Sequence, residues 1–299
     1  AGLPAMSEWR VRGVDALTYV SGGVELGLSG VETMIGYSLN DRLDFSAFNT
    51  ARVLTLTAGG LLDGFNLVEA GFNGVFQNMN TLLGSSAADN LQNLNANLTW
   101  NIQRGAYSVS SGARMLDFSS IETINAGSGQ DIFNLSGVAD IDLYGGAGAD
   151  IFHFAAGVQW TGKLDGQAGS DTLDFAGYTL AIQVMLGYDS ATDGFDGVVS
   201  GLGGQFANID VLVGTALADR LVGVDAVSLW HVTGAQSGRY ERLNSLTFSA
   251  IENLDGGRQA DNFVLDRGVI LAGAIHAGAG VDTLSWAGWS TARNIQLTG

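Results

Sequence analysis

The feature that most constrains the fold is a short phrase that recurs eight times: a turn closes on an aspartate, and an alternation of apolar residues follows. The clearest copy is GAGADIFHF, Gly146–Phe154. The eight aspartates are Asp41, Asp89, Asp131, Asp150, Asp171, Asp219, Asp261 and Asp282. Self-similarity at a regular spacing is the signature of a repeat architecture, in which each unit stacks on its neighbours.

The spacing of these aspartates indicates two levels of repeat. Successive intervals are 48, 42, 19, 21, 48, 42 and 21, which corresponds to one or two units of about 20 residues, a period typical of solenoid coils. The series from Asp41 to Asp171 is longer than the series from Asp171 to Asp282, and the difference equals the Asp131–Asp150 interval: (171 − 41) − (282 − 171) = 150 − 131. The second series has therefore lost one coil. We divide the chain into super-repeats 1–41 (partial), 42–171, 172–282 and 283–299 (partial).

Between the aspartates, the sequence has the pattern of short strands. RVLTLT, from Arg52, and IQVML, from Ile182, alternate with the period of two that marks a strand with one buried face. No stretch of a dozen residues keeps a helical period. We therefore predict an all-β fold, a right-handed parallel β-helix over residues 1–299 with about 13–14 coils of roughly 20–24 residues. The glycine-rich stretches Leu61–Val75 and Tyr188–Gly204 are interpreted as loops that leave the coil.

Three tryptophans recur at one position of the repeat. Trp9, Trp100 and Trp230 each precede an aspartate of the set, Asp41, Asp131 and Asp261, by nearly the same interval. A large aromatic side chain at one coil position is expected to stack inside the solenoid. The alternative is an exposed platform that binds carbohydrate.

Composition excludes several classes of protein. The chain has 44 glycines, one proline and 46% apolar residues, which suits many tight turns around a buried core. The net charge of −17 disfavours nucleic acid as a partner. No apolar run is long enough for a membrane span, and the absence of cysteine excludes disulfides. We expect a secreted or cell-surface protein, and we interpret the chain as a piece of a longer one because both ends fall inside repeats.

One turn has the pattern of a calcium site. GGAGADIFH, Gly145–His153, fits the nonapeptide of calcium-binding repeat-in-toxin rolls. The turns before Asp131 and Asp171 are near matches, so Asp131, Asp150 and Asp171 are candidate calcium ligands stacked on one edge. The alternative is structural, since aspartates often accept N–H bonds from their own turn. It is favoured by Asp41, Asp89 and Asp219, whose preceding turns contain one glycine each. We therefore expect no required cofactor.

The sequence offers little for catalysis. The acids Glu32, Glu122, Asp210 and Glu252 sit at one coil position just before the turn, one in each phrase, which suits a solvent-facing edge or a capped turn. The three histidines, His153, His231 and His276, lie in different contexts and form no ligand set. We expect no enzyme; a β-helical polysaccharide-degrading enzyme is the weakest of the alternatives.

The phrases LDFSAF, IETINAGSGQDIF, GGAGADIFHF and DGQAGSDTLDF resemble the repeat regions of large secreted bacterial adhesins. These are the filamentous-haemagglutinin-like proteins of two-partner secretion systems and related biofilm-matrix adhesins. The resemblance covers Trp9 to Gly299. It implies a β-helical stalk outside the cell that serves in adhesion, matrix or filament. The partners it implies are cell surfaces, matrix polysaccharide or neighbouring copies of the chain, with end-to-end or lateral self-association. A calcium-stabilised solenoid is the second interpretation.

Overall fold

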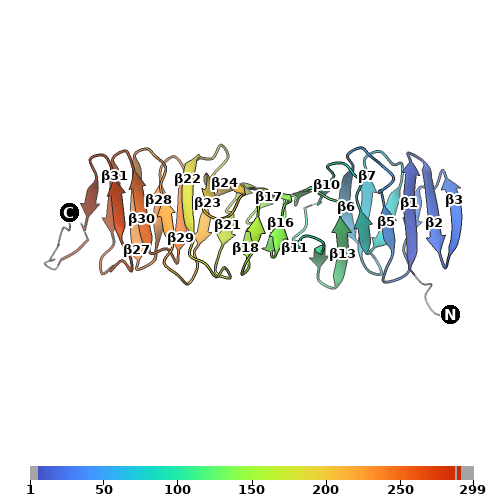
Figure 1. Cartoon of the computed structure of the whole chain (residues 1–299), viewed down its shortest axis with the longest axis horizontal. Helices are drawn as coiled ribbons and strands as arrows, with labels where there is room; N and C mark the ends of the chain where they lie inside the picture. Colours follow the sequence, from blue (N-terminus) through green and yellow to red (C-terminus); the bar gives the residue numbers. More distant parts are fainter. Residues whose placement is uncertain (1–5, 94, 287, 291–299) are drawn as a thin grey trace.

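The computed structural model describes residues 6–93, 95–286 and 288–290, and all regular secondary structure in these ranges is β-strand. The strands form an elongated body with the N-terminal strands at one end and the C-terminal strands at the other (Figure 1). A 17-stranded sheet (sheet A) and a 14-stranded sheet (sheet B) run along it, with one two-stranded sheet at the side. The prediction of an all-β fold is confirmed. Among the described residues, no helix has the length and apolar character to cross a membrane.

The strands are assigned to the sheets as follows. Sheet A holds β1 (Ser7–Gly13), β2 (Ala16–Ser21), β3 (Val24–Ser29), β5 (Arg42–Asp44), β9 (Thr81–Leu83), β11 (Thr99–Ile102), β12 (Tyr107–Ser111), β13 (Arg114–Ser119), β15 (Ile132–Leu135), β18 (Ile151–Phe154), β21 (Thr172–Asp174), β25 (Val211–Val213), β27 (Ser228–Gly234), β28 (Ser237–Glu241), β29 (Ser245–Ser249), β31 (Asp261–Leu265) and β33 (Thr283–Ser285). Sheet B holds β4 (Thr33–Ile35), β6 (Val53–Gly59), β7 (Phe65–Glu69), β8 (Val75–Met79), β10 (Asn90–Gln92), β14 (Thr123–Asn125), β17 (Asp142–Gly148), β20 (Lys163–Gly169), β22 (Gln183–Asp189), β23 (Phe195–Val199), β24 (Gln205–Ile209), β26 (Arg220–Val222), β30 (Asn253–Gly257) and β32 (Ile275–Gly278). The small sheet pairs β16 (Val138–Ala139) with β19 (Gln159–Trp160).

The chain passes back and forth between sheets A and B, and each passage stacks on the previous one. Equivalent strands pair in parallel, with equivalent side chains aligned: Leu43 lies opposite Leu82, and Phe133 opposite Phe152. Because side chains alternate between the two faces of a strand, one set points between the sheets. That set is the apolar core, and Leu43, Leu82, Phe133 and Phe152 are fully buried in it.

Pairing is not parallel throughout, and this corrects the prediction of a purely parallel fold. Five antiparallel meanders interrupt the stack: β1–β3, β6–β8, β11–β13, β22–β24 and β27–β29. In each, the chain moves ahead along the sheet and folds back to fill the gap. Thus β11 pairs in parallel with β15, while β13 pairs in parallel with β9. Period-two alternation is the same in both kinds of pairing, so the sequence pattern did not separate them.

The two stretches interpreted as loops belong to these meanders. Leu61–Val75 contains β7, and Tyr188–Gly204 contains β23, each paired antiparallel on both sides. The loop interpretation was wrong because glycines within a strand, such as Gly197, interrupt the apolar pattern.

Residues 33–92 and 163–222 make the same pairings, strand for strand. Thr33 pairs with Val75 as Lys163 pairs with Gln205. Likewise, β6 pairs with β10 as β22 pairs with β26. The last part of the partial super-repeat 283–299, residues 291–299, lies outside the described residues.

The recurrent tryptophans belong to the core. Trp100 and Trp230 are 0% exposed and stack on Phe133 and Phe263 at ring-centroid distances of 6.1 and 5.4 Å. Trp9 is partly buried against the core and lies 4.4 Å from the Tyr19 ring. Stacking inside the fold is therefore confirmed, and Trp100 and Trp230 are not carbohydrate platforms. Burial of each such side chain is worth about 2–3 kcal/mol.

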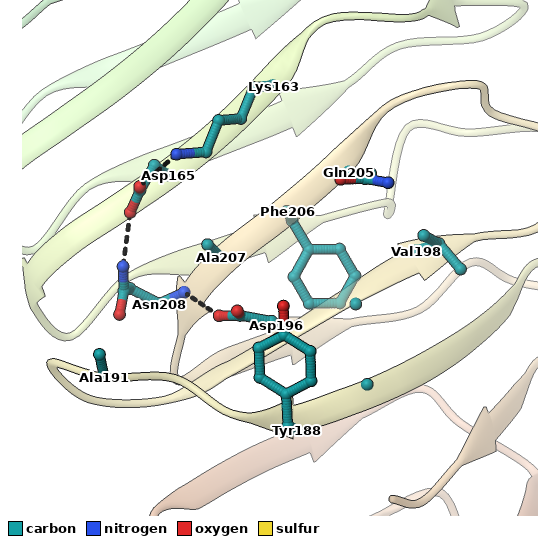
Figure 2. A pocket seen from close by; sticks show the side chains of 12 residues that line it. Lys163, Asp165, Tyr188, Ala191, Asp196, Val198, Gln205, Phe206, Ala207 and Asn208 are labelled. Atoms are coloured by element: carbon teal, nitrogen blue, oxygen red, sulfur yellow. Dashed lines mark hydrogen bonds and ion pairs between the residues drawn. The ribbon is translucent and has the colours of Figure 1, made fainter.

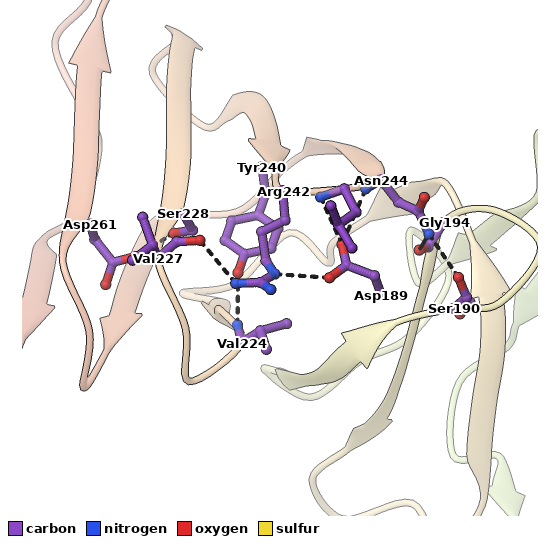
Figure 3. Close-up of polar contacts among 11 residues, drawn as sticks. Asp189, Ser190, Gly194, Val224, Val227, Ser228, Tyr240, Arg242, Asn244 and Asp261 are labelled. Carbon is purple, nitrogen blue, oxygen red and sulfur yellow. Dashed lines mark hydrogen bonds and ion pairs between the residues drawn. The ribbon is translucent and has the colours of Figure 1, made fainter.

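One polar cluster ties the two sheets together (Figure 3). Asp189, at the end of β22 in sheet B, accepts hydrogen bonds from Arg242 Nε at 3.0 Å and from the N–H groups of Leu243 and Asn244 at 3.2 and 3.1 Å. These donors lie in the β28–β29 turn of sheet A. Asn244 Nδ2 also donates to the carbonyl of Gly194 at 2.8 Å. Neighbouring meanders of opposite sheets are thus joined at their ends.

Candidate functional site

The repeated aspartates lie on two edges of the stack, not one. Asp89 and Asp219 sit where the chain passes from sheet A to sheet B, between β9 and β10 and between β25 and β26. The other six lie on the opposite edge, where the chain passes from B to A: Asp41, Asp131, Asp150, Asp171, Asp261 and Asp282. The same sequence pattern, a turn that ends in aspartate and is followed by a strand, therefore occurs at both edges. At each edge the chain turns from a strand of one sheet into a strand of the other.

Asp131, Asp150 and Asp171 lie in three successive passages and are each 0% exposed. The N–H of Asp131 donates to Asp150 Oδ1 at 2.7 Å, and the N–H of Asp150 donates to Asp171 Oδ1 at 2.8 Å. Asp131 Oδ1 accepts the N–H of Leu98 at 2.9 Å. We call these three residues the aspartate ladder. Each carboxylate holds the backbone of the preceding passage through one oxygen.

The second oxygen separates two kinds of turn. In the glycine-poor turns, Ser38, Ser85 and Thr215 donate an N–H to Oδ2 and a hydroxyl to Oδ1 of their aspartates. In the glycine-rich turns, the buried Oδ2 atoms of Asp131, Asp150, Asp171 and Asp261 have no hydrogen-bond partner among the described residues. The residues four positions before Asp131, Asp150 and Asp171 have positive φ: 98° at Gly127, 105° at Gly146 and 72° at Gln167. That conformation leaves Oδ2 without the N–H donor found in the other turns.

The carboxyl groups of the aspartate ladder are buried, and their Oδ2 atoms lack a hydrogen-bond donor among the described residues, so their pKa values are shifted. Desolvation is the largest effect on all three carboxyls, and it raises the pKa of Asp131 to about 7, of Asp150 to about 6 and of Asp171 to about 7. The N–H bonds that each accepts oppose this shift, and the neighbouring carboxylate adds to it at Asp131 and Asp171.

The acids expected at a solvent-facing edge or a capped turn mostly cap a neighbouring turn. Glu122 accepts the N–H of Asp89 at 2.8 Å, and Glu252 that of Asp219 at 2.6 Å. Asp210 accepts the N–H of Asp171 at 3.1 Å, on the opposite edge. His153 pairs with Asp174 at 2.7 Å. Within the described ranges, no group of three or more His, Cys, Asp or Glu side chains is placed to hold a metal ion.

A groove that the sequence analysis missed lies on the outer face of sheet B (Figure 2). Its volume is about 440 Å³. It crosses four adjacent strands in the order β20, β24, β23 and β22. Lys163 and Asp165 come from β20, and Tyr188 from β22, with the small residue Ala207 between them on β24.

Hydrogen bonds hold the polar rim of this groove. Lys163 Nζ lies 2.9 Å from Asp165 Oδ2 and 4.9 Å from the centre of the Tyr144 ring. Asn208 Nδ2 donates to Asp165 Oδ1 at 2.6 Å, and the Asn208 N–H lies 3.4 Å from Asp196 Oδ1. The hydrogen bond to Asp165 raises the pKa of Lys163, so it stays charged. Tyr188, at the other end of the groove, is 64% exposed.

The signal for this groove is present in the sequence as a departure from the repeat. Equivalent positions in residues 33–92 hold Thr33, Ile35, Ala58, Asn66 and Gln77 in place of the groove residues. These five sequence differences are scattered along the chain. They are seen to share one surface, the outer face of sheet B, once residues 33–92 and 163–222 are aligned strand by strand.

Comparison of the sequence with models of known protein families, and with curated proteins, finds no match.

Proposed function

We propose that this chain is a rigid structural and adhesive segment of an extracellular protein, built as a right-handed β-solenoid. It would serve as part of a bacterial surface adhesin, a biofilm-matrix protein or a filament. The partners we propose are cell surfaces, matrix polysaccharide or neighbouring copies of the chain. The proposal assigns no catalytic residue.

The observation that best supports this function is the continuity of both sheets along the body. Sheet A is hydrogen-bonded from β3 to β33, and sheet B from β4 to β32. Bending such a body requires backbone hydrogen bonds to break in both sheets at once, so it resists bending. The net charge of −17 and the absence of cysteine suit a soluble extracellular surface that needs no disulfides.

The test is the shape and binding of the purified chain. Small-angle scattering and negative-stain imaging should show straight rods of uniform width. Rods immobilised on beads should retain bacterial cells or matrix polysaccharide from suspension. Compact or freely bending particles would contradict the structural part, and straight rods that retain neither would contradict the adhesive part.

A second candidate function, a calcium-stabilised solenoid, is favoured by one observation. The Oδ2 atoms of Asp131, Asp150 and Asp171 are buried without a hydrogen-bond partner among the described residues. Calcium takes six to eight oxygen ligands, so backbone carbonyls of the glycine-rich turns would have to complete the set. Thermal unfolding followed by circular dichroism, with calcium and then with excess EGTA, separates the two candidates. We expect an unchanged midpoint; a large loss of stability on chelation would favour calcium.

A further inference from the structure

We propose that the groove on sheet B binds a neutral saccharide. This inference rests on the proposed adhesive function, to which it adds a place on the molecule and a class of ligand. It is carried by the difference between two equivalent surfaces of the same chain.

The floor of the groove is made of small residues. Gly187 and Ala207 stand where the first super-repeat has Thr57 and Gln77. Because Gly187 and Ala207 have short side chains, the outer face of residues 163–222 is hollowed there. Residues 33–92 have longer side chains at both floor positions.

The walls of the groove carry side chains that the equivalent positions in residues 33–92 lack. Lys163, Asp165 and Asp196 replace Thr33, Ile35 and Asn66. Tyr188 replaces Ala58 and is 64% exposed. An exposed aromatic ring beside polar walls is placed to pack against an apolar face of a ligand, while its hydroxyl can hydrogen-bond to the same ligand.

The donors and acceptors of the rim define the ligand chemistry. Asp165 and Asp196 are acceptors only, so a ligand must bring its own donors. Lys163 supplies donors, and the buried Asn208 Oδ1 has no partner among the described residues. A ligand that both donates and accepts along its length, with an apolar face for Tyr188, is a polyhydroxylated ring. Two carboxylates against one ammonium, on a chain of net charge −17, disfavour an anionic saccharide.

Two substitutions test the groove by copying the first super-repeat. Tyr188→Ala installs the residue found at position 58 and removes the aromatic wall. Ala207→Gln installs the residue found at position 77 and fills the floor. The matched control is Gln77→Ala, which changes the equivalent position of the first super-repeat. Each change is on the outer face, so circular dichroism and imaging should show the fold and rod unchanged.

The measurement is binding of the full chain to a panel of neutral polysaccharides, a glucan, a mannan and a galactan, with alginate as the anionic member. We expect the unsubstituted chain to bind at least one neutral polysaccharide, and both groove variants to lose tenfold or more in affinity. The control should bind as the unsubstituted chain does. The inference is overturned if no neutral polysaccharide binds, if alginate binds most tightly, or if the groove variants bind normally. Any of these results with straight rods leaves the structural proposal standing; loss of rod shape in the unsubstituted chain would contradict that proposal instead.

Discussion

At each repeated aspartate, the preceding turn determines how many hydrogen bonds the carboxylate accepts. Asp89 accepts from Ser85 and from the N–H of Arg52 at 2.6 Å, so both of its oxygens are satisfied. Asp150 accepts one N–H on Oδ1, and its Oδ2 has no donor in the described part of the chain. A buried oxygen without a donor costs about 1–3 kcal/mol relative to a satisfied one. The same residue type is therefore stabilising in one turn and costly in the other.

The aspartate ladder makes stability depend on pH in a definite direction. A carboxyl whose pKa is raised on folding is protonated more readily in the folded state, so the folded state loses relative stability as pH rises from about 4 to 7. For Asp150, with a pKa raised to about 6, the loss is on the order of 3 kcal/mol once the pH exceeds that value.

Asp150→Asn should remove the part of this loss of folding stability that comes from ionisation of Asp150. Asparagine keeps an acceptor for the Asp131 N–H and has no charge to desolvate, so we expect a higher melting temperature than the unsubstituted chain at pH 8 and no gain at pH 4. Melting curves at several pH values by circular dichroism provide the check. Asp89→Asn serves as the control and should destabilise at pH 8, because it places an amide group against the Ser85 donors. Parallel pH profiles for Asp150→Asn and the unsubstituted chain would contradict the account.

At the scale of the element, side-chain and turn hydrogen bonds join the β22–β24 meander of sheet B to the β27–β29 meander of sheet A. These hydrogen bonds are additional to the strand pairing within each sheet. The Asp189–Arg242 pair is largely buried, with side-chain exposures of 10% and 17%. Three donors converge on one carboxylate there, from a turn in the opposite sheet. The cluster fixes how far one meander lies from the next.

Asp189→Ala should destabilise the chain by about 2–4 kcal/mol, because it leaves the Arg242 Nε–H and two backbone N–H groups unpaired in a mostly buried place. Asp189→Asn should cost less, since one oxygen still accepts. Denaturant unfolding gives the free energies. Glu25→Ala removes an exposed ion pair with Arg10, with Glu25 61% exposed, and should change stability by under about 0.5 kcal/mol. Equal costs for Asp189→Ala and Glu25→Ala would show that the cluster is dispensable.

At the scale of the whole molecule, successive passages pair with their neighbours along the axis. β15 pairs with β11 and β18, and β18 with β15 and β21, with the same residues of each strand in register. Removing one complete unit therefore brings equivalent strands together, as in other stacked repeat folds.

Deletion of Ile132–Asp150, one complete interval between successive aspartates, should give a folded and shorter rod. It joins Asp131 to Ile151, so that β18 replaces β15 beside β11, and β20 replaces β17 beside β14. Circular dichroism should keep its β spectrum, and unfolding should remain cooperative. Deletion of residues 132–141, about half a unit, is the control and should abolish folding because it shifts sheet A against sheet B. Unfolding of both deletion variants would contradict a modular stack.

The repeat phrase alone determined the all-β class, the burial of Trp100 and Trp230, and the adjacency of Asp131, Asp150 and Asp171. These are local properties: a turn that ends in aspartate and an alternation of period two mean the same in every copy. The direction of pairing, the split of the aspartates between two edges and the groove at Lys163 and Tyr188 were decided by tertiary structure. Antiparallel and parallel strands share one alternation, and groove residues from four strands meet only once the sheet has placed those strands side by side.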